Sequence, residues 1–170
     1  MRKEDIVRKR RIKASGYVEK LARNLKKALP YYEDGLAKLQ GEKSRKNKFP
    51  NDPGVYVILR KCDIPEINYR YKGLSTKSPI AIYVGKATSK RTIAKRLSDH
   101  FGGTKLNFQG SQFVKFLMQL IQDEGEVQRF LWSPNTLIAC VPVKEGDDVI
   151  NAVEKLAMQV FLPRFNIKDR

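Results

Sequence analysis

Residues 80–100, IAIYVGKATSKRTIAKRLSDH, decide the fold, and the other elements are arranged around them. Their β-branched and apolar beginning predicts a short buried strand over residues 80–85. A polar turn follows, and apolar residues at helical spacing then predict a helix over residues 91–101. A strand that leads directly into a short helix can bring Tyr83 of the strand close to one face of that helix.

The predicted helix carries polar groups on its inward face. Residues four apart share a helix face, so Arg96 and His100, the single histidine of the chain, point the same way as Leu97. Lys95 and Asp99 are expected to face solvent. This pattern departs from a plain amphipathic helix, in which charge lies on the outer face. An inward cation and imidazole could meet the strand tyrosine at one place, as a hydrolytic site requires.

Two further segments are predicted to be strands. The segment GVYVILR at 54–60 is β-branched and apolar, and LIACVPV within residues 136–143 has the same character. Residues 61–79 contain proline, glycine and serine and are expected to form a long excursion between two strands that pair as a hairpin. The expected fold class is therefore α/β in the α+β sense, with a small three-stranded, mainly antiparallel sheet flanked by helices.

Two core helices are predicted towards the C-terminus. Apolar residues at helical spacing indicate one helix over residues 111–123 and another over residues 147–161, with Asp147 or Asp148 available as the N-cap of the second. Glu154 falls within the apolar face of the second helix. A lone carboxylate on a buried face is costly unless it is paired or binds a metal.

The chain is strongly basic, with 34 Lys and Arg residues against 18 Asp and Glu residues and a net charge of +16. Residues 1–50 hold 16 of the basic and 6 of the acidic residues. Such an excess favours polyanionic partners, because neutralising phosphates releases condensed counterions. Residues 1–13 are too charged to pack and are expected to form a solvated arm that is mobile or becomes ordered on DNA.

The basic N-terminal third is expected to be helical where it is not an arm. Apolar spacing predicts a helix over residues 16–29, which Pro30 ends, and a second short helix that includes Leu36 and Leu39. A linker rich in Gly, Pro and Lys follows at residues 41–53. The predicted organisation is a basic helical extension with its linker over residues 1–49 and a compact domain over residues 50–170.

Several classes of protein are disfavoured by the composition. Cys62 and Cys140 are far apart and have no CxxC or Cys/His spacing, so no zinc site is suggested, and Cys140 is expected to be a small buried filler. No apolar run approaches the length of a membrane span, and the N-terminus lacks the apolar core of a signal peptide. A cytoplasmic protein with no membrane partner is expected.

The order of these residues resembles that of the GIY-YIG nuclease superfamily. The tripeptide GVY at 54–56 stands at the place of the GIY motif, and YVG at 83–85 stands at the place of the YIG motif. Arg96 follows in the next helix, Glu154 lies on a late helix, and Asn166 completes the ending, as in the family. Either tripeptide alone is a weak signal, but the five features in order on the expected elements make a strong one.

Three departures from the family pattern indicate a branch. Both motifs carry Val in place of Ile, and Tyr56 and Tyr83 are 27 residues apart, which is wider than in compact members. His100 stands one turn beyond the arginine, where many members carry a tyrosine. With the helical N-terminal extension, these features look most like the type II restriction endonucleases of the superfamily.

The resemblance implies a role for each residue of the motifs. Glu154 would hold one Mg²⁺ ion, with Mn²⁺ able to substitute, and the other ligands would be water and phosphate oxygens. Arg96 would hold the scissile phosphate. Tyr56 would activate the attacking water, with its pKa lowered by the metal and Arg96 and with His100 accepting its proton. Tyr83 would orient the water or the phosphate.

Structural roles remain open for the same side chains. Glu154 could bridge to Arg96 within the fold, and the tyrosines could be strand residues with wet hydroxyl groups. Lys86 could contact phosphate or be a solvated turn lysine. Asn166 could tie the C-terminal segment to the site through side-chain hydrogen bonds or simply cap a turn. Gly54 and Gly85 are expected to allow close approach of backbone or phosphate.

The resemblance leaves base recognition to the extension and the loops. Arg, Lys, Asn and Gln side chains read base edges in the major groove, whereas contacts to phosphate only position a protein. Residues 61–79 and 102–112 carry the candidates, which are Arg70, Lys72, Lys77, Lys105, Asn107 and Gln109.

The function expected from the sequence is a Mg²⁺-dependent, sequence-specific endonuclease for double-stranded DNA, of the type II restriction kind. A palindromic target would imply a homodimer with one active site for each strand. The alternatives are a repair or homing endonuclease with the same chemistry, or a basic DNA-binding module without catalysis. An idle module would have no need for two tyrosines, an arginine, a histidine and a glutamate in this order.

Overall fold

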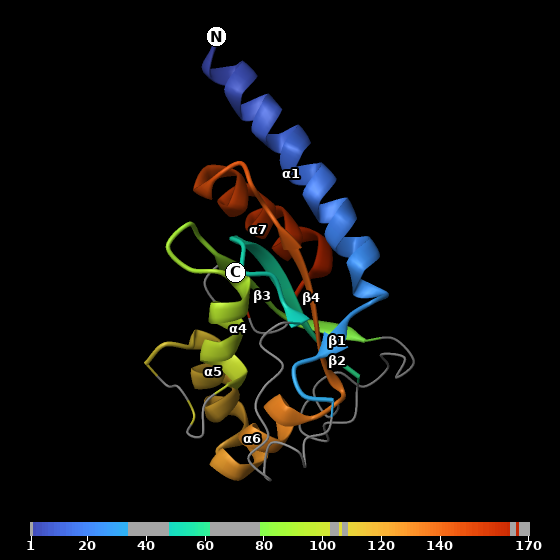
Figure 1. The fold of residues 1–170 in the computed structure, drawn as a ribbon, viewed down its shortest axis with the longest axis vertical. Helices are drawn as coiled ribbons and strands as arrows, with labels where there is room; N and C mark the ends of the chain where they lie inside the picture. Colours follow the sequence, from blue (N-terminus) through green and yellow to red (C-terminus); the bar gives the residue numbers. More distant parts are fainter. Residues whose placement is uncertain are drawn as a thin grey trace.

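The computed structural model describes residues 2–33, 48–61, 79–102, 106, 109–163 and 166. The chain forms one sheet with helices on both faces (Figure 1). In order, the elements are α1 (Lys3–Leu25), β1 (Leu29–Pro30), β2 (Gly54–Arg60), β3 (Ile80–Ala87), α4 (Ile93–Phe101), α5 (Gln112–Ile121), α6 (Glu124–Trp132), β4 (Thr136–Pro142) and α7 (Asp147–Phe161). No helix in the described part of the chain is long and apolar enough to cross a membrane.

The sheet is antiparallel with the strand order β1-β4-β2-β3. The expected α+β class is confirmed, and so is the antiparallel pairing of the two motif strands. The expected number of three strands is wrong, because β1 adds a fourth at one edge, where Leu29 pairs with Ile138. Pro30 is tolerated there because an edge strand has a side on which no N–H group is required. β3 forms the other edge.

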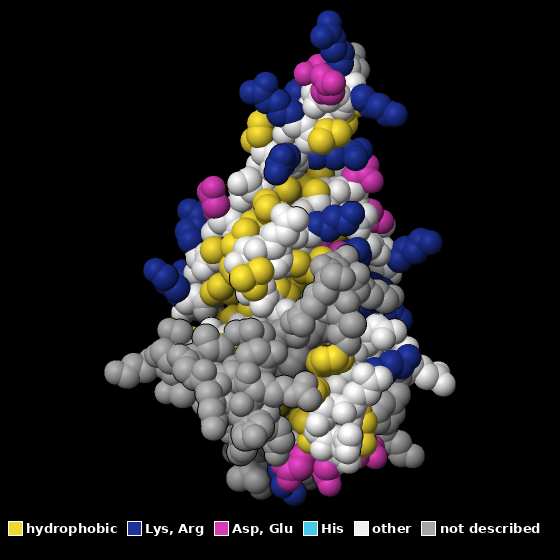
Figure 2. All heavy atoms as spheres, turned by 180° about the vertical axis from the view of Figure 1, so that it is seen from behind, with side chains coloured by type: hydrophobic (Ala, Val, Ile, Leu, Met, Phe, Trp, Pro, Cys, Tyr) yellow, Lys and Arg dark blue, Asp and Glu magenta, His cyan; other side chains and the backbone are white. Residues whose placement is uncertain are grey.

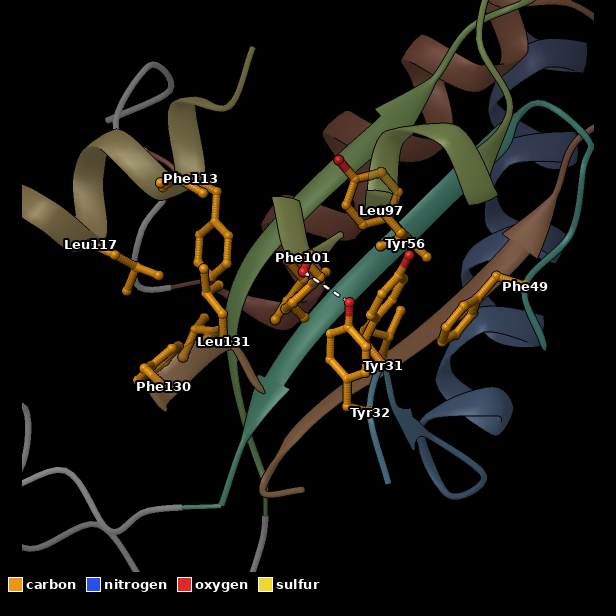
Figure 3. Packing of buried hydrophobic residues seen from close by; sticks show 14 of the residues in the cluster. Tyr31, Tyr32, Phe49, Tyr56, Leu97, Phe101, Phe113, Leu117, Phe130 and Leu131 are labelled. Carbon is orange, nitrogen blue, oxygen red and sulfur yellow. Dashed lines mark hydrogen bonds between the residues drawn. The ribbon is translucent and has the colours of Figure 1, made fainter. Parts of the chain in front are cut away.

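Helices α4, α5 and α6 cover one face of the sheet, and α1 and α7 cover the other (Figure 1). Successive side chains of β2 alternate between these layers, so every residue of the strand is buried. Tyr56 and Ile58 join an aromatic cluster on the α4 side, where Tyr32 donates a hydrogen bond to the Phe101 carbonyl at 3.4 Å (Figure 3). Val55 and Val57 pack on the α7 side.

The basic N-terminal segment is helical from Lys3, so the expectation of an arm without regular structure over residues 1–13 is wrong. Lys, Arg and Glu are good helix formers, and the Asp5 carboxylate accepts a hydrogen bond from the Arg2 backbone N–H at the helix start. Further along, Ala14, Val18 and Leu21 are buried in the cluster that includes α7. The end of α1 nearest the N-terminus extends beyond the rest of the molecule (Figure 1).

The N-terminal extension contributes to the core of the molecule on both faces of the sheet. Tyr31 and Tyr32 belong to the cluster on the α4 side, and α1 packs on α7 and β4. The predicted division between residues 1–49 and 50–170 stays a prediction. The expected short helix at Leu36 and Leu39 and most of the linker lie outside the described residues.

Two details near the C-terminal half differ from expectation. α6 has no counterpart among the expected elements, and its N-cap is Asp123, whose side chain accepts a hydrogen bond from the Glu126 N–H. α7 spans the expected residues, but its N-cap is Gly146 at φ 100°, so neither Asp147 nor Asp148 is the cap. Asp147 instead accepts hydrogen bonds from the backbone and hydroxyl group of Ser89, in the turn after β3.

Candidate active site at the edge of the sheet

Tyr56 lies in the middle of the sheet and reaches under the neighbouring strand. The residue has no exposed surface, and it stands opposite Gly85 in the β2–β3 register. A Cβ atom at Gly85 would overlap the Tyr56 hydroxyl oxygen and lie 2.8 Å from Cε2 of the ring. The glycine therefore provides the space that the phenol occupies, which is the close approach expected for this residue.

His100 of α4 is held at both ring nitrogens. Its Nε2 atom lies 2.7 Å from the Tyr56 hydroxyl, and its Nδ1 atom lies 2.6 Å from Oγ of Ser111. Ser111 is also the N-cap of α5, where Oγ accepts the Val114 N–H at 3.0 Å. Ser111 was not among the residues predicted from the sequence. A serine directly before an apolar helical run identifies an N-cap, but not its second partner.

Tyr83 joins this pair from the edge strand. It stands opposite Ile58, so its side chain lies on the same face of the sheet as Tyr56. Its ring centroid is 5.7 Å from that of His100 and 6.4 Å from that of Tyr56. Phe113 of α5 packs at 5.0 Å from Tyr83, and Tyr83 keeps part of its surface exposed. The structure thus brings together the two motif tyrosines and the histidine.

Arg96 lies one turn before His100 on α4, with 23% of its side chain exposed. Its guanidinium group donates to the Gly110 carbonyl at 3.3 Å and lies 3.6 Å from the Asp99 carboxylate. Asp99 was expected to face solvent but is only 20% exposed, because it also pairs with Arg91 at 2.5 Å. Arg96 is thus held at the side of the tyrosine pair with part of its charge open to solvent.

Glu154 approaches from the other face of the sheet and pairs with Lys86. The Lys86 Nζ atom lies 2.6 Å from Oε2 of Glu154, with the side chains 36% and 16% exposed. Lys86 stands opposite Val55, which places it on the α7 side of β3. The structural alternative of a bridge from Glu154 to Arg96 is wrong, because Glu154 pairs with Lys86 instead. Lys86 is a strand residue and not a solvated turn lysine. The candidate site therefore straddles the edge strand.

Burial dominates the electrostatics of the tyrosines. Burial raises the pKa of Tyr56, the Tyr83 phenol raises it further, and the Arg96 charge lowers it by less. Arg96 lowers this pKa, as expected, but burial outweighs the effect of Arg96, and the expected contribution of a metal stays a prediction. Burial likewise raises the pKa of Tyr83, where Arg96 opposes and Glu154 adds to the shift. The charges of Arg96 and Glu154 thus both act on the two phenols.

Burial and the nearby Arg96 charge lower the pKa of His100 to about 3. The imidazole is therefore neutral at physiological pH, and one of its ring nitrogens is unprotonated. A neutral ring carries one N–H and one unprotonated nitrogen, so it donates one hydrogen bond and accepts one.

We expect this buried histidine to make the protein less stable in mild acid. Unfolded His100 takes up a proton as the pH falls through 6.5, whereas the folded ring stays neutral until about pH 3. The contribution of the neutral His100 to the free energy of unfolding is fully present above pH 6.5 and is lost as the pH falls towards 3. The free energy of unfolding should fall by about 2 kcal/mol between pH 7 and 5. Chemical denaturation of the wild type and of His100→Gln measures this, and an equal fall in both would contradict it.

Asn166 ties the C-terminal segment to the edge strand through side-chain hydrogen bonds, which is one of its two expected roles; the other was to cap a turn. Its side chain accepts a hydrogen bond from the Val84 N–H at 2.8 Å and donates one to the Val84 carbonyl at 2.7 Å. These backbone groups lie between Tyr83 and Gly85 on a strand that is the edge of its sheet. The asparagine therefore fixes the backbone at the centre of the candidate site.

The candidates for base recognition are mostly outside the described residues. Gln109 is described and exposed, and it precedes Gly110, whose carbonyl accepts from Arg96. Its place beside Arg96 is compatible with a contact to DNA near the site. The candidates that lie outside the described residues are Arg70, Lys72, Lys77, Lys105 and Asn107.

The Glu154 carboxylate supplies an oxygen donor of the kind that magnesium prefers. The described part of the chain has no group of three or more His, Cys, Asp or Glu residues close enough to share a metal. Lys86 binds Oε2 of Glu154, whereas Oε1 has no hydrogen-bond partner among the described residues. Magnesium prefers oxygen ligands and keeps several waters, so one half-buried carboxylate with a free oxygen fits it.

Comparison with models of protein families, with curated proteins and with solved structures finds no match for this chain.

Proposed function

We propose that this protein is a Mg²⁺-dependent endonuclease that hydrolyses double-stranded DNA by GIY-YIG-type chemistry, as a type II restriction enzyme. The observation that carries the proposal is the buried hydrogen bond between Tyr56 and His100 with Arg96 beside it. A proton acceptor, a phenol and a fixed cation can supply the proton transfer and the charge stabilisation on which phosphodiester hydrolysis depends. The net charge of +16 supplies attraction for DNA.

In the proposed reaction, the Tyr56 oxygen takes a proton from the attacking water as its own proton moves to Nε2 of His100. The resulting hydroxide forms the new bond to phosphorus, and the bond to the leaving oxygen breaks with its electron pair on that oxygen, which then takes a proton from solvent water. Arg96 neutralises the charge that develops on the phosphate, a role suited to its permanent cation. Tyr56 has no exposed surface, so substrate must open a path for one water to its oxygen.

The metal would be held by Glu154 at the opposite side of the edge strand. Bound Mg²⁺ supplies charge neutralisation at the phosphate and at the leaving oxygen. Lys86 already places an ammonium group on this carboxylate, and it is the cation that would move towards the phosphate when the carboxylate takes up a metal. The partly exposed groups of the site are Tyr83, Lys86, Arg96 and Glu154, so these meet the phosphate first.

A digest of unmethylated phage and plasmid DNA tests the proposal. Purified protein with Mg²⁺ is expected to give discrete fragments that disappear with EDTA and that map to one short sequence. A palindromic site would indicate a symmetric dimer with one active site for each strand. A metal-dependent smear, or cutting only of damaged or branched DNA, would favour a repair or homing nuclease. Binding of DNA without any cutting would leave only the basic binding module.

The projecting end of α1 should contribute DNA affinity without taking part in cleavage. Dark blue Lys and Arg side chains surround this end of the helix (Figure 2). The exposed basic residues there are Arg2, Lys3, Arg8, Lys9, Arg10, Arg11 and Lys13, against two acidic ones, Glu4 and Asp5. Cations on all sides of a helix suit a partner with phosphates on both sides, as in a groove of duplex DNA.

Removing one of these cations should therefore change how DNA binding depends on salt. We expect Arg8→Gln or Arg11→Gln to make the slope of log K against log salt shallower by about 0.9 for each phosphate that the variant no longer neutralises. Fluorescence anisotropy with a duplex in EDTA measures this slope. Arg129→Gln is the control, because Arg129 is an exposed arginine of α6 at the other end of the molecule (Figure 1). Equal slopes in all four proteins would exclude α1 from the interface.

A further inference from the structure

Ser111 stands in a position to decide which nitrogen of His100 carries the proton. Ser111 is fully buried, and its Oγ atom lies 2.6 Å from Nδ1 of His100, on the side of the ring opposite Tyr56. Because Oγ already accepts the Val114 N–H at 3.0 Å, one lone pair and one hydrogen remain for His100. Ser111 can therefore either accept a hydrogen bond from Nδ1 or donate one to it.

The surroundings of Tyr56 distinguish the two arrangements. The Arg96 charge lies close enough to lower the pKa of the Tyr56 phenol, which favours the phenol as a hydrogen-bond donor. Nε2 of His100, at 2.7 Å, is the acceptor within reach. Outside a protein a phenol is a more acidic donor than an aliphatic hydroxyl such as that of Ser111, and this order favours Tyr56 over Ser111 as the donor to the single unprotonated nitrogen of the ring. Nδ1 must then carry the ring proton.

We propose that Ser111 is a positioning residue whose Oγ accepts the Nδ1–H of His100, which leaves Nε2 without hydrogen and directed at the Tyr56 hydroxyl. The titratable and charged groups that face this ring are Tyr56 from β2, Tyr83 from β3 and Arg96 from its own helix. The hydrogen bond at Nδ1 is made by Ser111. The side chain that ends one loop as a helix cap thus also orients the imidazole.

This inference rests on the proposed function where it concerns the reaction. When the Tyr56 proton moves to Nε2, the ring becomes an imidazolium with two N–H donors. Nε2–H then faces the Tyr56 oxygen, and Nδ1–H keeps its bond to Oγ, so no group has to turn during the transfer. The opposite tautomer would hold Nε2–H against Tyr56 and could not accept its proton.

The single histidine makes the ring proton directly measurable. In protein labelled with ¹⁵N-histidine, long-range ¹H–¹⁵N spectra at neutral pH should show Nδ1 protonated and Nε2 unprotonated, with no other histidine signal. Ser111→Gly removes the acceptor, and glycine weakens an N-cap by only a few tenths of a kcal/mol. We expect this variant to lose the predominance of the Nδ1–H form and to reduce the kcat of cleavage about 10-fold to 100-fold without a matching change in KM.

Asp123→Gly is the matched control, because it removes the side-chain cap of α6 and leaves His100 untouched. The control should keep the wild-type tautomer and kcat. A wild-type spectrum with Nε2 protonated, or an unchanged ring in Ser111→Gly, would overturn the inference. The spectra need no DNA, so they decide the role of Ser111 even if the protein cuts nothing, whereas an inactive wild type would count against the proposed function alone.

Discussion

Replacing Glu154 with Gln is expected to reduce Mg²⁺-dependent cleavage on the order of 10³-fold, since one charged ligand would be lost from a site that has a single carboxylate. The change keeps the shape of the side chain and removes only its charge. Glu154 is the carboxylate whose field reaches both Tyr56 and Tyr83, and one of its oxygens is free for a metal among the described residues. Single-turnover cleavage at saturating DNA and a titration of Mg²⁺ would measure the loss.

The same change should leave the fold intact. Lys86 loses its partner, but an ion pair with a side chain 36% exposed contributes no more than about 1 kcal/mol. Thermal unfolding of Glu154→Gln should therefore follow that of the wild type closely. A loss of activity with an intact fold would separate a role at the metal from a structural role in the pair with Lys86.

Asp148→Asn on the same helix is the matched control. Asp148 is 68% exposed and pairs with Arg10 of α1, away from the tyrosines. The substitution removes the same charge from the same element, so cleavage should stay at the wild-type rate. If Glu154→Gln also cut at that rate, Glu154 would be a structural partner of Lys86, and the metal would need ligands from elsewhere.

The parts of the fold that the sequence predicts well are those with a dense local pattern. The β-branched run at Gly54–Arg60 forms a strand with these bounds, and the apolar spacing after Gly146 gives the helix Asp147–Phe161. β1 escapes prediction because a two-residue strand exists only through its partner β4. The high charge at the start of α1 predicts a solvated arm, but the helix propensity of Lys, Arg and Glu makes this segment helical.

In the candidate site, too, the local sequence pattern predicts some contacts, whereas others depend on how distant elements pack. Helical spacing places Arg96 and His100 on one face, and the hairpin register brings Tyr56 to Tyr83, so their meeting could be expected. The pair of Lys86 with Glu154 could not, because it depends on which face of an edge strand Lys86 occupies. Ser111 lies eleven residues after His100, and only the packing of α5 beside α4 brings it to the ring.

Replacing Gly85 with Ala is expected to damage both the fold and the proposed chemistry. Gly85 does not have a positive φ, which among the described glycines only Gly146 has. The requirement at Gly85 is therefore for space and not for backbone freedom. A methyl group would meet the Tyr56 hydroxyl, Cζ and Cε2, all inside van der Waals contact. Such overpacking costs about 1–3 kcal/mol or more, because Tyr56 is fully buried and β3 is held to β2 by the ladder.

The stability and the position of the phenol can be measured separately for this variant. Urea unfolding should show the loss of free energy, and the ¹⁵N signal of His100 should move because its Nε2 partner is displaced. Cleavage should fall as far as in Tyr56→Phe, for which we expect a loss of about 10²-fold to 10⁴-fold. Both variants remove the phenol from Nε2, the first by displacement and the second by deletion.

Gly16→Ala provides the control for the glycine itself. Gly16 lies inside α1, and a Cβ atom there would have no neighbour within 4 Å, so alanine should stabilise the helix by roughly 0.5–1 kcal/mol. The two substitutions are chemically identical, but a Cβ atom has space at Gly16 and none at Gly85. They should therefore change the free energy of unfolding in opposite directions. A Gly85→Ala protein as stable as the wild type, with an unshifted His100 signal, would mean that Tyr56 does not lie beneath Gly85, and the hydrogen bond on which the proposed activity depends would lose its structural basis.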